Sequence, residues 1–344
     1  MSKHINKLSK KNLVLLISVV SCVFLYFMLT IISNQVANTQ PYNRIVEEWD
    51  QTGRSSVIGT YFSDNTCLSL DDIMMLEYDL TSTLRQDSYE ATENGRLFVD
   101  AYSYKTDVSL WTNRAGNVIC TAYAVNADFF KFHNFKLISG SFFSSDDVNH
   151  RSIVLDKDAA WKMFGAINVN GMTLEFDGEE YVVAGVVENE EGFMTKQAAA
   201  NACVAYMPIE VMCEPDEYVI NSFEIVFPNP VKKYALNKVS AGMEKLVGDD
   251  SNVKIVDCSA RYDLISSLMR IRDWTKRGMS FDVVRTPYWE NASVGVENVV
   301  DLLTLLRFVF IVPAIIIVIV EIIKFHPLHR LKLLGLKVIN KIRR

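Results

Sequence analysis

The chain has 344 residues, of which 49% are hydrophobic, and a formal net charge of −6. An acidic chain of this size can bury a large core, but it lacks the basic surface that nucleic-acid binding needs. The charges are unevenly spread, and this unevenness indicates a membrane protein rather than a nucleic-acid partner.

The first predicted element is a transmembrane helix over residues 13–33, after a short N-terminus of residues 1–12. Residues 13–32 contain no charge, and about 20 apolar residues suffice to cross a hydrocarbon core of about 30 Å. A cleaved signal peptide is the alternative, but its apolar region would be only about 7–15 residues long. We therefore expect the segment to remain as an anchor.

Outside this span, residues 34–53 predict a helical stalk interrupted by Pro41, and a strand follows near residues 57–62. Ser69, with Asp72 three residues later, is a variant of the capping box and predicts a helix start. The apolar residues of that helix recur at helical spacing: Ile73, Leu76, Leu80 and Leu84.

The next part of the chain has mainly β character. Residues 96–125 are rich in aromatic and β-branched residues and predict strands. Short helices are expected at 127–133 and 157–164. Residues 172–187 predict two strands joined at Asp177-Gly178, a strong hairpin signal.

Residues 222–257 predict a βαβ unit, with strands at 222–227 and 252–257 around a helix at 231–247. Two such strands are expected to run parallel in one sheet, with a right-handed connection. The helix has one apolar face: Val231, Ala235, Val239, Met243 and Leu246. A last helix is expected at 260–271, with Leu264 and Leu268 directed inward.

These elements predict an α+β domain of residues 34–300 that has two lobes. A βαβ-rich lobe would include the chain to about residue 57 and again after 205. A mainly-β lobe, about 95–200, would be inserted into it.

A second transmembrane helix is predicted over residues 301–323, because residues 302–320 are almost wholly apolar. Arg307 is expected to extend toward the outer headgroups, and Pro313 to kink the helix. The alternative makes Arg307 part of an intramembrane ion pair or conduit. Residues 324–344 predict a basic helix on the inner membrane surface, with contact to a cytoplasmic partner as the alternative.

Charge predicts the orientation in the membrane. The two flanks, 1–12 and 321–344, carry eleven Lys and Arg and one acidic residue, whereas residues 34–300 carry 23 basic and 39 acidic side chains. By the positive-inside rule we expect both termini to be cytoplasmic and the acidic domain to be extracytoplasmic, in a bacterial plasma membrane.

The cysteines do not predict a complete disulfide framework, because five lie outside the spans: Cys67, Cys120, Cys203, Cys213 and Cys258. Cys203 and Cys213 could be bridged. Cys120 and Cys203 fall in strand-like runs, where cysteine behaves as a small apolar residue. We expect mostly reduced, buried cysteines and no metal site.

Residues 125–187 resemble a known family in an ordered set of positions. The set is Val125, Asp128, Phe129, Phe130, Leu137, Gly140, Phe143, Asp146, Asp147, Ala160, Phe164, Gly165, Gly171, Val183, Gly185 and Val186. This pattern is similar to the periplasmic core domain of MacB-type ABC transporter permeases, the class that includes FtsX-like proteins. In organisation the resemblance extends over residues 13–320.

The shared glycines have a structural interpretation. Gly140 and Gly165 suit helix ends or turns that need a positive φ, and Gly185 permits a close backbone approach within a strand. The shared aromatic and acidic residues are interpreted in the same way. Phe129, Phe130 and Phe164 are expected in the core, and Asp146 and Asp147 are expected to cap a turn.

The sequence also departs from the family, whose permeases usually have four spans. Two spans cannot enclose a conduit, and the chain has no Gly-x-x-x-x-Gly-Lys-[Ser/Thr] phosphate loop. The resemblance therefore implies a separate ATPase and a fuller permease subunit as partners, besides membrane lipid and a possible homo- or hetero-oligomer.

An enzyme is not expected. The two outer histidines, His133 and His150, form no recognisable catalytic motif, and His133 is expected at a surface or half-buried position. No motif in the sequence indicates a catalytic, cofactor-binding or metal-binding residue. Two hypotheses remain: a transport subunit that couples a separate ATPase and permease to an external substrate or partner, or an envelope scaffold or sensor that binds another extracytoplasmic protein.

Overall fold

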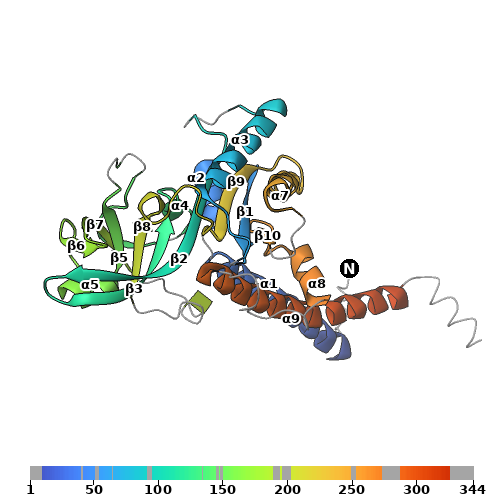
Figure 1. Cartoon of the computed structure of the whole chain (residues 1–344). Coiled ribbons are helices and arrows are strands. Elements are labelled where there is room, and N and C mark those ends of the chain that lie inside the picture. Colours follow the sequence, from blue (N-terminus) through green and yellow to red (C-terminus); the bar gives the residue numbers. More distant parts are fainter. Residues whose placement is uncertain are drawn as a thin grey trace, which may run out of the picture. The chain divides into compact units, whose positions relative to one another are not determined.

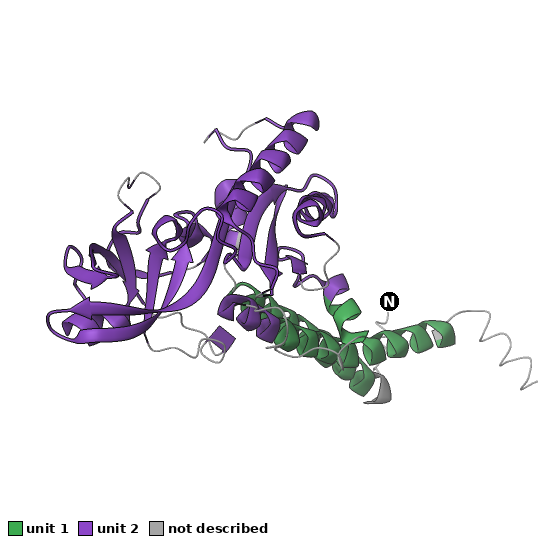
Figure 2. Ribbon diagram, viewed as in Figure 1, with its two compact units in different colours: residues 1–39, 267–272, 297–344 green, residues 40–266, 273–296 purple. Residues whose placement is uncertain are grey.

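The structure is a computed structural model. It describes residues 10–39, 42–50, 54–63, 65–90, 95–133, 135–144, 147, 150–188, 194–195, 203–248, 253–272 and 287–325. The first nine residues, Asp146 and the basic tail from residue 326 lie outside the described residues. The chain forms two compact units, one of residues 1–39, 267–272 and 297–344, the other of residues 40–266 and 273–296 (Figure 2).

The first unit contains the two long apolar helices. They are α1 (Lys10–Ala37) and the larger part of α9 (Tyr288–Phe325). Both are long and apolar enough to cross a membrane. Helix α9 begins well before residue 301 and continues through Pro313. Arg307 donates a hydrogen bond from Nη2 to Thr304 Oγ1, one turn toward the start of the helix.

The second unit is built on one mixed sheet in the order β10-β1-β9-β2-β3-β8-β5-β7-β4, with β6 paired to β2 and β7 (Figure 1). The strands are β1 (Ser55–Phe62), β2 (Val99–Thr112), β3 (Gly116–Val125), β4 (Leu137–Gly140), β5 (Ser152–Asp156), β6 (Thr173–Phe176), β7 (Glu179–Val187), β8 (Val204–Pro208), β9 (Ser222–Pro228) and β10 (Val253–Asp257). The helices are α2 (Tyr42–Trp49), α3 (Leu70–Gln86), α4 (Phe129–Phe132), α5 (Lys157–Phe164), α7 (Tyr234–Val247) and α8 (Leu264–Arg272), with a 3₁₀ turn at Ile209–Val211. The fold class is α+β, as predicted.

Strand β2, predicted within the inserted lobe, pairs with strands of both predicted lobes. Its first residues, Val99–Ser103, pair with β9, and residues Ser103–Thr112 continue alongside β3. The two regions therefore form the two ends of one sheet. One end is covered by α3 and α7, and the other by α5. Strands β1 and β9 are buried on both faces, with α2 and α4 on the face opposite α3 and α7.

Helix α3 confirms the predicted capping box. Ser69 accepts a hydrogen bond from the Asp72 backbone N–H (3.1 Å), and the Asp72 carboxylate accepts one from the Ser69 N–H (3.0 Å). The four apolar residues predicted on its inner face are all buried: Ile73, Leu76, Leu80 and Leu84.

The predicted βαβ unit is present in outline, because β9 and β10 are both antiparallel to β1 and hence parallel to each other. Strand β1 lies between them, which the sequence did not predict. Helix α7 begins at Tyr234, three residues later than expected, after Lys233 in a left-handed conformation. Val231 therefore precedes the helix and is exposed, so its assignment to the inner face was wrong.

The predicted hairpin joins β6 to β7. Asp177 and Gly178 have φ values of 52° and 77°, as a tight two-residue hairpin turn requires. A close approach of β4 to β7 explains two family positions, since an added Cβ would lie 2.0 Å from Ala184 O at Gly140 and 2.4 Å from Ser141 O at Gly185.

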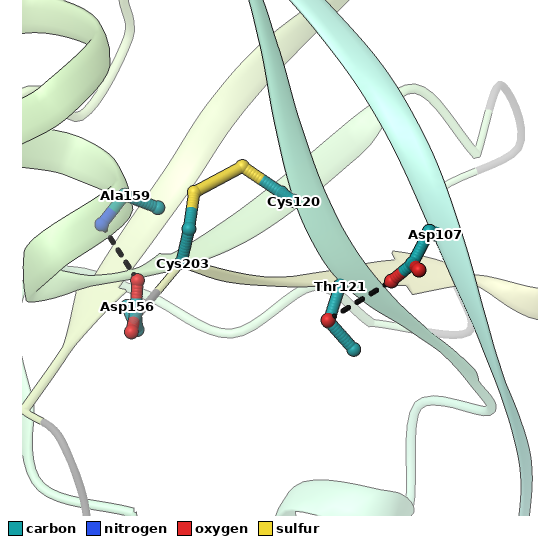
Figure 3. The surroundings of a disulfide bond; sticks show 6 residues. All are labelled: Asp107, Cys120, Thr121, Asp156, Ala159 and Cys203. Carbon is teal, nitrogen blue, oxygen red and sulfur yellow. Dashed lines mark hydrogen bonds between the residues drawn. A yellow bond between two sulfur atoms is a disulfide. The ribbon is translucent and has the colours of Figure 1, made fainter. Parts of the chain in front are cut away.

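The expectation for the cysteines was wrong in one respect. Cys120 of β3 and Cys203, immediately before β8, form a disulfide with a Cα–Cα distance of 5.0 Å (Figure 3). Cys203 is therefore not bridged to Cys213, and Cys67, Cys213 and Cys258 form no disulfide. The two bonded residues lie on neighbouring parallel strands, a relation that strand prediction alone does not give.

Two predicted peripheral elements belong to the core instead. Helix α2, part of the expected stalk, packs on β1 and β9 and buries Tyr42 and Ile45. His133, expected at or near the surface, is 1% exposed at the end of the four-residue α4. Because both segments pack on the sheet, the Tyr42 hydroxyl and the His133 imidazole lie within the core.

Candidate functional site at the start of helix α9

A group of buried charged side chains of the second unit lies where α9 begins. Glu290, in the first turn of α9, is fully buried, and its carboxylate receives a bidentate ion pair from Arg261 at 2.8 and 2.9 Å. Lys254 of β10 adds a contact from Nζ at 2.8 Å. Together with Trp289 these residues are called the α9 junction below. A carboxylate in this setting is held by two cations in a fixed geometry.

The local chain path explains why Arg261 reaches this position. The turn after β10 is fastened to β1, because the Cys258 N–H donates to Val57 O (2.8 Å) and the Val57 N–H donates to Ser259 Oγ (2.9 Å). The Asp257 carboxylate accepts from the Ala260 N–H (3.2 Å), which closes the turn. The guanidinium of Arg261 is thereby carried on the sheet, not on a loose loop.

Trp289 attaches the same turn of α9 to the aromatic core. Its ring centroid lies 4.6 Å from that of His133, 5.4 Å from Phe129 and 5.8 Å from Tyr123. Phe129 and Phe130 are buried, as expected, while Phe164 is partly buried against the cluster under α5. One of the family-like phenylalanines, Phe129, therefore contacts the first turn of α9 through Trp289.

A second buried carboxylate lies beneath this seat. Glu224, in the middle of β9, accepts hydrogen bonds from Tyr61 (3.1 Å) and Tyr42 (3.3 Å), and His133 Nε2 lies 3.1 Å from its other oxygen. Burial, with the nearby Glu224 carboxylate, raises the pKa of both tyrosines well above the usual range. Both phenols therefore keep their protons and remain donors.

Helix α9 continues the polar pairing in the first unit. Arg270 of α8 donates to both oxygens of Asp301, at 2.7 and 2.9 Å, and lies 3.8 Å from Glu297. Residues 290, 297 and 301 fall within about 40° of one another around a helix with 100° per residue. The acidic residues of α9 before its apolar part thus form one narrow stripe.

This arrangement can hold a helix in place, but it offers no reactive group to a substrate. Arg261, Glu290, Glu224 and His133 are each at most 2% exposed in their side chains. Within the described residues, no group of three or more His, Cys, Asp and Glu side chains is arranged to hold a metal ion.

The other residues considered from sequence lie elsewhere. Asp147 accepts a hydrogen bond from Ser152 Oγ (2.6 Å), and its carbonyl receives the His150 N–H (3.1 Å), so it organises a turn. His150 lies 3.8 Å from Glu210, apart from His133.

Sequence reasoning missed Glu224, Arg261 and Glu290. Two signals were available. A glutamate interrupts the apolar run of β9, and acidic residues spaced by seven and four precede the second apolar segment. Neither signal shows which basic residue pairs with the carboxylate.

Comparison with known proteins shows the family of this protein. The family model described as MacB-like periplasmic core domain matches residues 13–232. The match covers more than half of the chain, so this protein belongs to the MacB-like family, whose domain is a component of ABC-type transporter permeases. With its two apolar helices, it is a membrane protein with an extracytoplasmic domain.

Solved structures show distant likenesses. The periplasmic region of MacB from Actinobacillus actinomycetemcomitans has 16% identity and a TM-score of 0.43, with 65% of this chain and 94% of that one covered. The extracellular domain of the noncanonic ABC-type transporter YknZ from Gram-positive bacteria has 14% identity and a TM-score of 0.41, with 58% and 99% covered. A domain of a putative permease from Porphyromonas gingivalis has 13% identity and a TM-score of 0.37, with 59% and 90% covered. A search of the curated proteins gives no match.

Proposed function

We propose that this protein is a membrane-anchored subunit of an ABC-type transporter in which α9 passes movement between the membrane and the extracytoplasmic sheet. The observation that carries the proposal is the bidentate Arg261–Glu290 pair. A single helix begins in the buried junction and includes the apolar segment, so its displacement acts directly on β10 and its neighbours. The driving ATPase and a fuller permease subunit would be separate chains.

The buried Arg261–Glu290 pair favours a rigid connection between α9 and the sheet. Removing one partner of a buried ion pair typically costs about 3–5 kcal/mol, because the other charge is left uncompensated. Trp289 adds an apolar anchor in the same turn. A transmitted force must exceed these interactions before α9 separates from the sheet, so small movements are passed on.

The test uses the full chain in native membranes, with Tyr78→Cys as an outward reporter on α3. We expect an ATPase-containing complex to co-purify, and ATP with vanadate to change thiol labelling at position 78. Arg261→Met should keep the complex and lose this change. Lys136→Met removes an exposed pair with Glu188 and should behave as the parent.

Where Arg261→Met fails to fold, the double variant Arg261→Met/Glu290→Leu replaces the pair by apolar groups and tests the same point. An unchanged ATP response in these variants contradicts coupling through the α9 junction. A chain that co-purifies with another extracytoplasmic protein and no ATPase would instead support the scaffold or sensor function.

For the topology, we propose cytoplasmic segments at 1–12 and 324–344, spans at 13–33 and 301–323, and an extracytoplasmic domain between them, with the inserted lobe near 95–200. The charge of the flanks supports this orientation. A membrane-impermeant thiol reagent should label a cysteine placed at Asn189 in intact cells. Labelling at Ser2 or Arg344 under the same conditions would contradict the proposal.

The basic tail is proposed to dock on anionic lipid or on the ATPase. Charge reversal of Lys332, Lys337 and Lys341 to Glu should release the partner or weaken binding to anionic vesicles. Unchanged behaviour in both assays would leave the tail as a topology signal alone.

A further inference from the structure

Helix α8 has its polarity reversed relative to a helix in water. Four of its five apolar residues are exposed: Leu264 (48%), Ile265 (57%), Leu268 (43%) and Met269 (63%). These positions follow the i, i+1, i+4, i+5 pattern and therefore share one face. The prediction that Leu264 and Leu268 point inward was wrong.

The opposite face of α8 is polar and covered. Ser267 is fully buried, and the Arg270 side chain is 11% exposed. Arg270 donates to Ser267 Oγ (3.1 Å) and to both carboxylate oxygens of Asp301. A surface helix in water places its apolar stripe toward the protein. Here the charged group faces the protein and the apolar side chains face outward.

The Arg270–Asp301 pair in the first unit shows which part of α9 lies next to α8. Asp301, the partner of Arg270, immediately precedes Leu302, where the apolar segment begins. Leu302 is itself 51% exposed, and Leu305 and Leu306 continue the exposed apolar surface of α9. The end of α8 is therefore paired with the residue directly before the apolar part of α9.

We propose that α8 lies in the outer interface of the membrane, with Leu264, Ile265, Leu268 and Met269 among the lipid chains near the headgroups. We assign lipid as the occupant because Arg270 pairs this helix with Asp301, directly before the exposed apolar residues of α9. A helix of nine residues is about 13 Å long, which suits a helix lying in the interface and not one that spans it.

A fluorescence experiment on the full chain tests this assignment. Leu268→Cys is labelled with an environment-sensitive nitrobenzoxadiazole group and reconstituted in vesicles of phosphatidylcholine and phosphatidylglycerol. We expect a blue-shifted emission that lipid with a nitroxide near the headgroup quenches and aqueous iodide does not. The label at Tyr78→Cys on α3 is the matched control, since Tyr78 is also exposed on a helix; it should respond to iodide alone. Labelling of the parent chain gives the background from its free cysteines.

Two results would overturn the proposal. Iodide quenching at position 268 equal to that at 78 places the face in water. Protection at 268 from both quenchers means that a protein surface, such as a second copy or a permease subunit, covers it. Met269→Cys repeats the measurement on the same face, so a local disturbance at one site does not decide the outcome.

Discussion

Helices α3 and α8 are both amphipathic, and they are arranged in opposite ways. α3 packs isoleucine and leucine against α7 and the sheet, while its outward side mixes acidic residues with Met74, Met75 and Tyr78. α8 buries a serine and most of an arginine and exposes its leucines. The difference teaches that periodicity locates the two faces of a helix, whereas the surrounding medium decides which face is turned inward.

The largest expected effect comes from truncating the inner face of α3. Leu76→Ala should lower the free energy of unfolding by about 3 kcal/mol, because it removes buried methyl groups and leaves a cavity. The Leu76 side chain lies against Gly242 of α7, which limits refilling. Met269→Ala on α8 is the matched control and should change it by less than about 0.5 kcal/mol. Denaturant unfolding of the full chain in detergent measures the free energy of unfolding of both variants. Equal losses in the two variants would contradict the difference between α3 and α8.

The second effect concerns the covered face of α8. If the inner face of α8 packed against an ordinary apolar core, Ser267→Leu would be expected to stabilise the helix. Here we expect a loss of about 2 kcal/mol, since the larger side chain overpacks a filled site and displaces the hydroxyl that Arg270 contacts. Ser267→Ala, which adds no volume, serves as the control in the same unfolding assay. A gain in stability on Ser267→Leu would refute the reversed polarity.

A smaller effect is expected at the start of α3. Ser69→Ala removes the acceptor for the Asp72 N–H and should cost about 1 kcal/mol. Ser69→Thr keeps a hydroxyl and should retain most of the stability. Thermal unfolding of the three chains compares them, and identical midpoints would show that packing alone holds the helix.

The smallest effect is expected for Asp100→Asn, beneath α3. It concerns how the free energy of unfolding depends on pH in the acid range. Burial, then the neighbouring Glu77 carboxyl, raises the pKa of Asp100 well above its usual range. A carboxyl with a raised folded pKa stabilises the fold fully below the unfolded value of about 3.9, and this contribution is lost as pH rises through the folded pKa. The parent should therefore lose stability at this site from about pH 4 upward, and Asp100→Asn should flatten that dependence. Parallel pH profiles of unfolding for the two chains would show that Asp100 keeps an ordinary pKa.

Much of the fold could be predicted because its signals are local. The capping box at Ser69, the Asp177-Gly178 hairpin and the apolar spans each depend on neighbours in sequence. The sheet order could not be predicted, since β1 separates β9 from β10 and only tertiary pairing places it there. The Cys120–Cys203 disulfide has the same cause, because its partners are 83 residues apart.

The candidate site was less predictable than the fold. His133 seemed peripheral because the sequence around it looks like a short amphipathic helix, yet α4 has only four residues and turns the imidazole inward. The partners of Glu290 come from a strand and a turn about 30 residues earlier. Charge complementarity across such separations is invisible to periodicity. The inward assignment of Leu264 failed for another reason, namely that the prediction assumed water around α8.

The acidic stripe of α9 has a consequence for how this helix can move. Glu290, Glu297 and Asp301 lie within about 40° of one another, and each faces an arginine carried by another segment. Rotation of α9 about its axis by one residue, about 100°, would carry all three away from their partners at once. All three ion pairs can therefore form at only one rotational position of α9. A tilt of α9 that moves the paired segments with it preserves every contact. A helix paired in this way can transmit a tilting motion, whereas rotation about its own axis would break its ion pairs.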